Sequence, residues 1–218
     1  MMAAQSIMLG HQDCMIAGGM ESMSNVPYVM KRAAPAYGGV KLDDLITHDG
    51  LTDAYNHCHM GVCGENTAEK MNISRADQDA YAIGSYHKSA DAWANGRFDS
   101  EVVPVTIKGK RGKPDTIVSV DEEFTRFNES KFGNLRAVFK KDGTVTAGNA
   151  STLNDGACAM VLMSAEKASA LGLKPLAKIL GFADAATQPI DFPIAPALAV
   201  PKALKWAGVA KEDVSKWD

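Results

Sequence analysis

Three short blocks of small, polar and titratable residues are spaced so that they could support catalysis or ligand binding. The blocks are residues 18–24, residues 59–61 with 65–68, and residues 143–151 with 154–157. Each block also has a structural explanation: glycine pairs turn a chain, a lone histidine is more often a core residue, and Ser and Asn cap helices and turns. None matches a Walker or Rossmann phosphate loop, so nucleotide binding of those kinds is unsupported.

The four cysteines, Cys14, Cys58, Cys63 and Cys158, form no Cys-x-x-Cys pair. Together with two histidines, Cys58 and Cys63 are crowded enough to raise a metal site. Structural zinc usually needs two separated ligand pairs, so we favour no metal there. Free cysteines without disulfide-like spacing favour a reducing compartment.

The composition is that of a soluble globular protein. The 218 residues carry 23 Lys and Arg against 26 Asp and Glu, a net charge of −3, and 46% are hydrophobic. A charge near zero gives no reason to expect nucleic acid or an anionic membrane as a partner. No apolar run approaches the ~20 residues that cross a bilayer.

Elements that could position the blocks alternate along the chain. The pattern predicts a helix from the first residue to Gly10, then a buried strand over 13–19 that ends in a turn at its glycine pair. Residues 25–53 are rich in Gly, Pro and Tyr and predict a loop with short helical pieces. The absence of a helix cap before Met1 suggests a segment of a longer chain.

A second set of elements follows. Ser74 and Asp77 predict a capping box for a helix that ends at Gly96. Its stripe of small residues predicts close core packing; the stripe consists of Ala76, Ala80, Ile83, His87, Ala90 and Ala94. We then expect a hairpin (102–107 with 116–120), a buried strand (157–163), a helix from its Ser164 cap to Gly172, a strand (176–182) and a helix (197–207). This alternation indicates an α/β framework with an insertion.

Taken together, the three blocks resemble those of the thiolase family. Their order matches, and so does the run over residues 183–196. The resemblance covers essentially the whole chain and is strongest to the mitochondrial, short-chain branch of the family.

The resemblance implies a five-layered α-β-α-β-α fold made of two similar halves. Residues 1–24 and 152–175 would belong to the N-terminal domain, residues 25–151 would form an inserted loop domain for CoA binding and oligomerisation, and residues 176–218 would begin the C-terminal domain. The chain would then lack both ends of the intact protein.

The family's reaction condenses two acetyl-CoA molecules to acetoacetyl-CoA, or runs in reverse as thiolysis. It needs a thiolate nucleophile, a cysteine acid/base and donors aimed at the developing oxyanion. In thiolases these groups belong to Cys-x-Ser-Gly, Gly-His-Pro and Cys-x-Gly-Gly-Gly motifs, none of which occurs in this sequence. We therefore expect no catalytic residue here and no turnover by this chain alone.

The resemblance also implies which residues bind substrate. His59 and Met60 would line the acyl and pantetheine pocket, Met60 favouring a short acyl group, and Ser151 would bond the pantetheine amide. Tyr86 would contribute to both CoA and potassium binding. The other positions are Arg126, Asn128 and Lys131 near the CoA nucleotide, and the carbonyls of Ala147, Gly148 and Ala150 around potassium; Asn128 stands where the family has an acid, and Gly148 where it has an alanine.

No covalently bound cofactor is expected; the partners would be acetyl-CoA, acetoacetyl-CoA and CoA, with a homotetramer in mitochondria for the intact protein. Two alternatives remain open. One is a non-catalytic protein of thiolase shape that keeps a CoA-binding or oligomerising surface. The other is a 3-ketoacyl-CoA thiolase of broader chain length.

Overall fold

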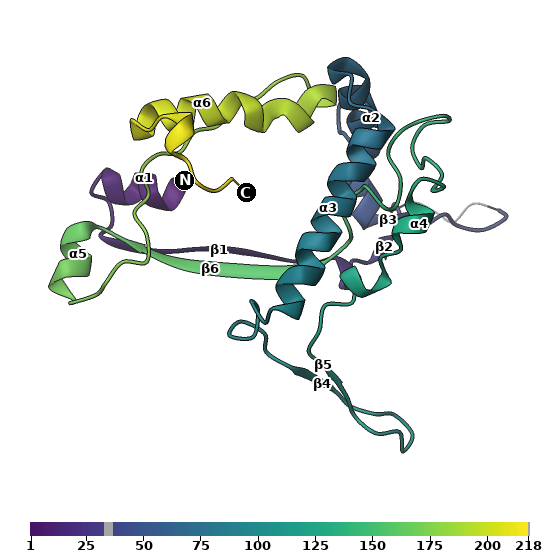
Figure 1. Cartoon of the computed structure of the whole chain (residues 1–218), viewed down its shortest axis with the longest axis horizontal. Coiled ribbons are helices and arrows are strands. Elements are labelled where there is room, and N and C mark those ends of the chain that lie inside the picture. Colours follow the sequence, from purple (N-terminus) through teal and green to yellow (C-terminus); the bar gives the residue numbers. More distant parts are fainter. Residues whose placement is uncertain (33–36, 218) are drawn as a thin grey trace. The chain divides into compact units, whose positions relative to one another are not determined.

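The computed structural model describes residues 1–32 and 37–217 (Figure 1). Contacts divide the chain into two compact units. The first unit combines Met1–Thr67 with Thr152–Asp218, and the second is Ala68–Ser151, which lies between those stretches in the sequence. None of the helices in the described part of the chain combines the length and hydropathy that a bilayer-spanning segment needs.

The first unit is built on a two-stranded antiparallel ribbon of β1 (Cys14–Ser22) and β6 (Asp155–Met163), seen as the long paired strands in Figure 1. Its register runs from Cys14 opposite Met163 to Ser22 opposite Asp155. The turn expected at Gly18 and Gly19 is wrong, because the strand continues through both. A Cβ on Gly18 would lie only 2.7 Å from the Cys158 carbonyl oxygen, so Gly18 permits a close approach of the two strands.

Both strands were expected to be buried, and in the described chain they are largely exposed. Ile16 and Met20 of β1 and Val161 of β6 keep more than half of their surface accessible. Each strand has a single hydrogen-bonded neighbour. Pairing therefore forms the ribbon without covering its faces.

Two short helices flank the ribbon, and their ends follow the sequence signals. Helix α1 (Met2–Met8) is followed by Gly10 at φ +73°, as predicted. Ser164 caps α5 (Ala165–Ala170) by accepting a 3.1 Å hydrogen bond from the amide of Lys167. Gly172, with φ +64°, follows that helix.

The irregular stretch after β1 is confirmed as loop with short helical pieces. It contains the 3₁₀ turn η1 (Met23–Asn25) and the five-residue π-helix η2 (Ile46–Gly50). Two short strands, β2 (Tyr28–Val29) and β3 (Asp43–Asp44), pair antiparallel within it. Residues 33–36 of this stretch lie outside the described residues, and α2 (Met60–Met71) follows it.

The strand predicted over residues 176–182 is wrong, because no neighbouring strand pairs with this segment in the described chain. Gly181 lies against a helix instead, where a Cβ would meet the Ala203 carbonyl oxygen at 2.8 Å. That helix, α6 (Ala195–Ala207), follows the 3₁₀ segment η4 (Pro189–Ile194). It stops at Gly208, φ +66°, as predicted, and η5 (Lys211–Asp213) comes after it.

The second unit is organised by α3 (Arg75–Ala94), whose capping box is confirmed. The Ser74 hydroxyl accepts from the Asp77 amide at 3.1 Å, and the Asp77 carboxylate accepts from the Ser74 amide at 3.0 Å. The remaining elements are η3 (Phe124–Arg126), α4 (Glu129–Phe132) and the hairpin of β4 (Val105–Ile107) and β5 (Thr116–Val118), whose existence the sequence predicted.

The face that α3 buries differs from the predicted small-residue stripe. Ile83 and Ala90 of that stripe are partly buried, but its other four members are exposed. Asp79 is buried and Tyr86 is partly buried, each one residue out of phase with the stripe. The Tyr86 ring stacks on Phe127 at 4.7 Å between centroids and meets Phe132 edge-on at 6.1 Å. Aromatic rings bury far more area than alanines, so they decide which face turns inward.

Candidate functional site

The pairing of β1 with β6 brings the first block and the end of the third together. The Ser24 amide and hydroxyl donate to the Asp155 carboxylate at 2.9 and 2.5 Å across a separation of 131 residues. These hydrogen bonds from Ser24 hold the pKa of Asp155 below its ordinary value. A stable carboxylate therefore fixes the loop that leaves β1.

The second block begins α2 with a histidine cap. The amide of Gly61 donates to His59 Nδ1 at 3.0 Å, and the amide of Met60 donates to the Leu51 carbonyl at 2.8 Å. Because Nδ1 acts as an acceptor, a neutral His59 carries its proton on Nε2. The hydrogen bond to Nδ1 therefore fixes the orientation of the imidazole at the start of α2.

The segment before His59 is shaped by Asp53, a buried carboxylate. It accepts hydrogen bonds from the amides of Tyr55 at 3.1 Å and Asn56 at 3.0 Å, and the Asp53 amide donates to the Cys58 carbonyl at 2.8 Å. Burial works to raise the pKa of Asp53, but these donors outweigh it and the pKa is lowered. The ionised side chain holds a tight turn in which His57 has φ +53°.

Asn66 connects the second block to the run at residues 183–196. Its side-chain amide donates to Asp191 Oδ1 at 2.8 Å and to the Ile190 carbonyl at 3.3 Å. The structure therefore gives Asn66 and Asp191 a shared role in fixing α2 against η4. The sequence indicated that both segments matter, but it did not predict the contact between Asn66 and Asp191.

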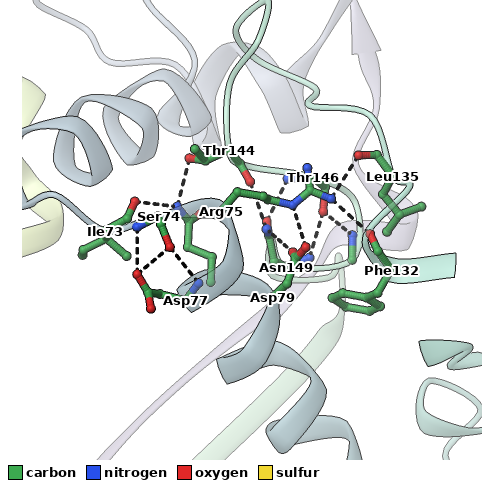
Figure 2. Close-up of polar contacts among 12 residues, drawn as sticks. Ile73, Ser74, Arg75, Asp77, Asp79, Phe132, Leu135, Thr144, Thr146 and Asn149 are labelled. Carbon is green, nitrogen blue, oxygen red and sulfur yellow. Dashed lines mark hydrogen bonds and ion pairs between the residues drawn. The ribbon is translucent and has the colours of Figure 1, made fainter. Parts of the chain in front are cut away.

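In the second unit, Figure 2 shows a polar network that joins α3 to the third block. Arg75 Nε donates to Asp79 Oδ2 at 2.7 Å, and Asn149 Nδ2 donates to Asp79 Oδ1 at 2.9 Å. The Arg75 guanidinium also donates to the carbonyls of Phe132 and Leu135 at 3.1 and 3.0 Å. Both oxygens of a buried carboxylate are satisfied, so this network fixes the third block to the helix.

Sequence reasoning missed Arg75, Asp79 and Asn149. The first two are spaced i, i+4 on a predicted helix, a spacing that favours an ion pair. The Arg75–Asp79 ion pair could therefore have been predicted from the sequence. No local pattern indicated that Asn149, 70 residues further on, would complete the carboxylate's partners.

The third block folds into a turn around Thr146, whose side chain is fully buried. Its hydroxyl accepts from the amides of Gly148 at 3.2 Å and Asn149 at 3.3 Å. In a trans peptide the C=O points opposite to the N–H, so the carbonyls of Ala147 and Gly148 both point away from Thr146. Carbonyl oxygens turned to one side suit a potassium ion, which proteins bind with backbone oxygens.

Tyr86 lies in the aromatic cluster with its hydroxyl donating to Glu123 Oε1 at 2.8 Å. Burial, together with the Glu123 carboxylate, raises the pKa of Tyr86 above its ordinary value of 10.0. The hydroxyl keeps its proton and directs it to Glu123. Its lone pairs remain able to face a cation or a polar ligand atom.

Gly148 is packed against this cluster. A Cβ at this position would lie 2.6 Å from Leu135 Cδ1 and 2.8 Å from Phe132 Cζ. Glycine therefore lets the turn approach the Phe132 ring, which itself meets Tyr86. Gly148 stands where the family has an alanine. The glycine keeps the backbone carbonyl and allows closer packing of the turn against Phe132 and Leu135.

The remaining predicted binding residues lie on the surface of the second unit. Arg126 is exposed and lies 3.5 Å from Glu122, and Asn128 accepts a 2.7 Å hydrogen bond from the Ser130 hydroxyl. Lys131 and Ser151 are exposed as well. The predicted residues thus fall into two sets: His59 and Met60 in the first unit, and the others in the second.

The crowded histidines and cysteines form no metal centre in the part of the chain that the structure describes. No three His, Cys, Asp or Glu side chains there are placed to hold an ion. The four cysteines are free thiols.

Comparisons with known proteins give a consistent picture. A family model described as "Thiolase, N-terminal domain" matches residues 1–166. Over 219 residues the chain is 64% identical to mouse "Acetyl-CoA acetyltransferase, mitochondrial" and 61% identical to its human counterpart, with all of this chain and 51% of each relative covered. The chain spans about half the length of these curated relatives.

Solved structures of thiolases also resemble the fold of this chain. Acat5 thiolase from Ascaris suum in complex with coenzyme A matches with a TM-score of 0.89 and 43% identity, over 99% of this chain and 55% of that one. Acetyl-CoA acetyltransferase from Syntrophomonas wolfei matches with a TM-score of 0.88 and 42% identity, over 99% and 54%. The fold of the described chain is therefore shared with both.

Proposed function

The chain belongs to the thiolase family, and from this premise we propose that the protein containing it is an acetyl-CoA acetyltransferase. It would condense two acetyl-CoA molecules to acetoacetyl-CoA and catalyse the reverse thiolysis. The observation that carries this proposal is the 61–64% identity to mitochondrial acetyl-CoA acetyltransferases across the whole chain. The same relatives support a mitochondrial location.

In this proposal the chain contributes substrate binding rather than bond making. Residues 25–151 would act as the CoA-binding and oligomerising loop domain between the two N-terminal segments, 1–24 and 152–175, with 176–218 opening the C-terminal domain. The related structure in complex with coenzyme A supports CoA as the ligand. A homotetramer is proposed from the family resemblance.

His59 and Met60 would meet the acyl end of the substrate. The capped start of α2 supports this role, because the hydrogen bond from the Gly61 amide to Nδ1 fixes the orientation of the imidazole. Met60 is unbranched and adaptable, and it would limit the pocket to a short acyl group. Ser151 would bond the pantetheine amide.

The nucleotide end of CoA would meet exposed basic and polar side chains. Arg126, Asn128 and Lys131 lie on the short η3–α4 segment of the second unit. Two cations in such a segment suit the phosphates of CoA. Asn128, in place of an acid, removes a negative charge that would repel them.

A potassium ion would be held by the carbonyls of Ala147, Gly148 and Ala150 with the Tyr86 hydroxyl. The turned carbonyls of the third block and the proton of Tyr86 directed to Glu123 both support this fit. Such an ion supplies a fixed positive charge beside the loop. Ser151 directly follows that loop, so its position depends on the same turn.

Bond making would depend on residues outside these 218. No cysteine here lies in a Cys-x-Ser-Gly or Cys-x-Gly-Gly-Gly motif, and no Gly-His-Pro occurs. A thiolase needs an activated thiolate and a second acid/base to exchange acyl groups. The chain by itself is therefore expected to bind without turning over.

The test is thiolysis of acetoacetyl-CoA by CoA, followed with the protein expressed from its complete coding sequence. We expect steady turnover that falls steeply when acetoacetyl-CoA is replaced by a long-chain 3-ketoacyl-CoA. The 218-residue chain at equal concentration is the matched control and is expected to show none. No cleavage by the complete protein would contradict the proposal, and equal cleavage of long chains would favour the broader 3-ketoacyl-CoA thiolase.

A further inference from the structure

Two of the four cysteines, Cys58 and Cys63, lie against one another in the first unit. Their sulfur atoms are 4.0 Å apart. Cys58 is partly buried in the segment before α2, and Cys63 is fully buried in the first turns of that helix. The proposed function uses neither side chain.

The backbone on both sides holds this pair in place. The Cys58 carbonyl accepts from the Asp53 amide at 2.8 Å, and Thr52 bridges to His59 beside it. Cys63 is fixed by α2, which begins three residues earlier. A disulfide needs the sulfurs to approach to ~2.05 Å, a shift of about 2 Å from their separation of 4.0 Å.

The two thiols differ in a way that sets an order of reaction. Burial, together with the sulfur contact to Cys58, raises the pKa of Cys63 to about 11, so Cys63 is a protonated thiol at neutral pH. Cys58 is the more accessible of the two. An oxidant from solvent therefore reaches Cys58 first, and Cys63 is placed to resolve the product.

We propose that Cys58 and Cys63 are a reversible redox modification site that closes to a disulfide when the chain meets a peroxide. The Cys58 thiolate attacks one peroxide oxygen, which forms an S–O bond and releases hydroxide. The Cys63 sulfur then attacks the sulfenic sulfur, the S–S bond forms, and the departing oxygen leaves as water with the Cys63 proton. Two thiols are oxidised and the peroxide is reduced; a thiol reductant reverses the change.

The disulfide would close a ring around His59 and Met60, the residues to which the proposed function gives the acyl pocket. The site itself does not depend on that function. It needs only the sulfur contact, the difference in exposure and a peroxide. A failure of the thiolysis assay would thus leave it standing.

Trypsin makes the site easy to test in the full chain. Cys58 and Cys63 share the tryptic peptide 42–70, while Cys14 and Cys158 lie in peptides 1–31 and 142–167. The reduced chain is treated with hydrogen peroxide, freed of it, unfolded and alkylated with N-ethylmaleimide. We expect peptide 42–70 to lose two hydrogens and take up no alkyl group, and to take up two after dithiothreitol.

Cys58→Ser and Cys63→Ala are the matched controls, and neither is expected to lose the two hydrogens. The exposed Cys14 and Cys158 report the oxidant dose. The proposal is overturned if peptide 42–70 still takes up two alkyl groups at a dose that oxidises Cys14 and Cys158. It is equally overturned if Cys58 crosslinks to one of those cysteines instead of Cys63.

Discussion

At the scale of single residues, Asp79 determines how the third block is held. It is 9% exposed, and its two carboxylate oxygens are taken by Arg75 and by Asn149 (Figure 2). Removing one member of a buried, hydrogen-bonded set leaves the others unsatisfied. The turn around Thr146 therefore depends on a carboxylate that makes no proposed contact with substrate.

Asp79→Ala should destabilise the second unit by about 2–4 kcal/mol, because Arg75 and Asn149 lose a charged, largely buried partner. Urea unfolding followed by far-UV circular dichroism measures this change. Lys88→Ala, at an exposed position on the same helix, is the control and should stay within about 0.5 kcal/mol. Equal effects of the two substitutions would show that the network does not hold the unit.

Tyr86 gives a pH-dependent prediction with a definite sign. Its pKa in the folded chain is raised above 10.0 by burial and by Glu123, so the folded state keeps the proton more tightly than the unfolded state. This stabilisation is complete below pH 10.0 and is lost as the pH rises through the folded-state pKa. The difference in unfolding free energy between the chain and Tyr86→Phe should be about 1 kcal/mol at pH 8.

The same difference should shrink when urea unfolding is repeated above pH 10.0. Tyr86→Phe keeps the stacking on Phe127 and removes only the hydroxyl. The comparison therefore measures the contribution of the hydroxyl group and not that of the ring. A difference that grows with pH would mean that Tyr86 does not donate to Glu123.

At the scale of elements, the β1–β6 ribbon shows how one glycine sets a strand contact. Gly18 lies where a Cβ would approach the Cys158 carbonyl to 2.7 Å, while a Cβ on Gly19 would meet nothing within 4 Å. Gly18 and Gly19 are adjacent in β1, but only Gly18 lies close to backbone atoms of β6. They form a matched pair for testing the ribbon.

Gly18→Ala should destabilise the chain by about 1–3 kcal/mol, because backbone atoms of β6 have to move. Gly19→Ala should be neutral or slightly stabilising, since alanine costs less conformational entropy than glycine within a strand. Thermal unfolding of both variants measures the contrast. Similar melting temperatures would contradict the close approach of Gly18 to the Cys158 carbonyl oxygen, in a register that pairs Gly18 with Ala159.

Element ends were predictable from the sequence, and long-range partners were not. Ser74, Ser164 and Gly208 signal helix ends through contacts with residues at most a few positions away, so local chemistry is sufficient. The strand expected over residues 176–182 was wrong because a strand needs a neighbouring strand to pair with. The stripe on α3 was right only in part, because the aromatic rings that pack on the helix decide which face is buried. The Ser24–Asp155 and Asp79–Asn149 contacts span 131 and 70 residues and leave no local trace.

At the scale of the whole molecule, the chain is a thiolase sequence that carries blocks assigned to binding and none assigned to bond making. The two sets of candidate binding residues lie in different units, and each is held by its own hydrogen bonds. None of the four cysteines lies in a Cys-x-Ser-Gly or Cys-x-Gly-Gly-Gly motif, so none is a candidate nucleophile.

The most direct test of this account is to incubate the chain with acetyl-CoA and map acetyl groups by tryptic mass spectrometry. The three cysteine-containing peptides, 1–31, 42–70 and 142–167, report all four thiols. We predict no stoichiometric acetylation on any of them, while the complete protein gains one acetyl-cysteine outside these residues. A stoichiometric acetyl group on Cys14, Cys58, Cys63 or Cys158 would contradict the account.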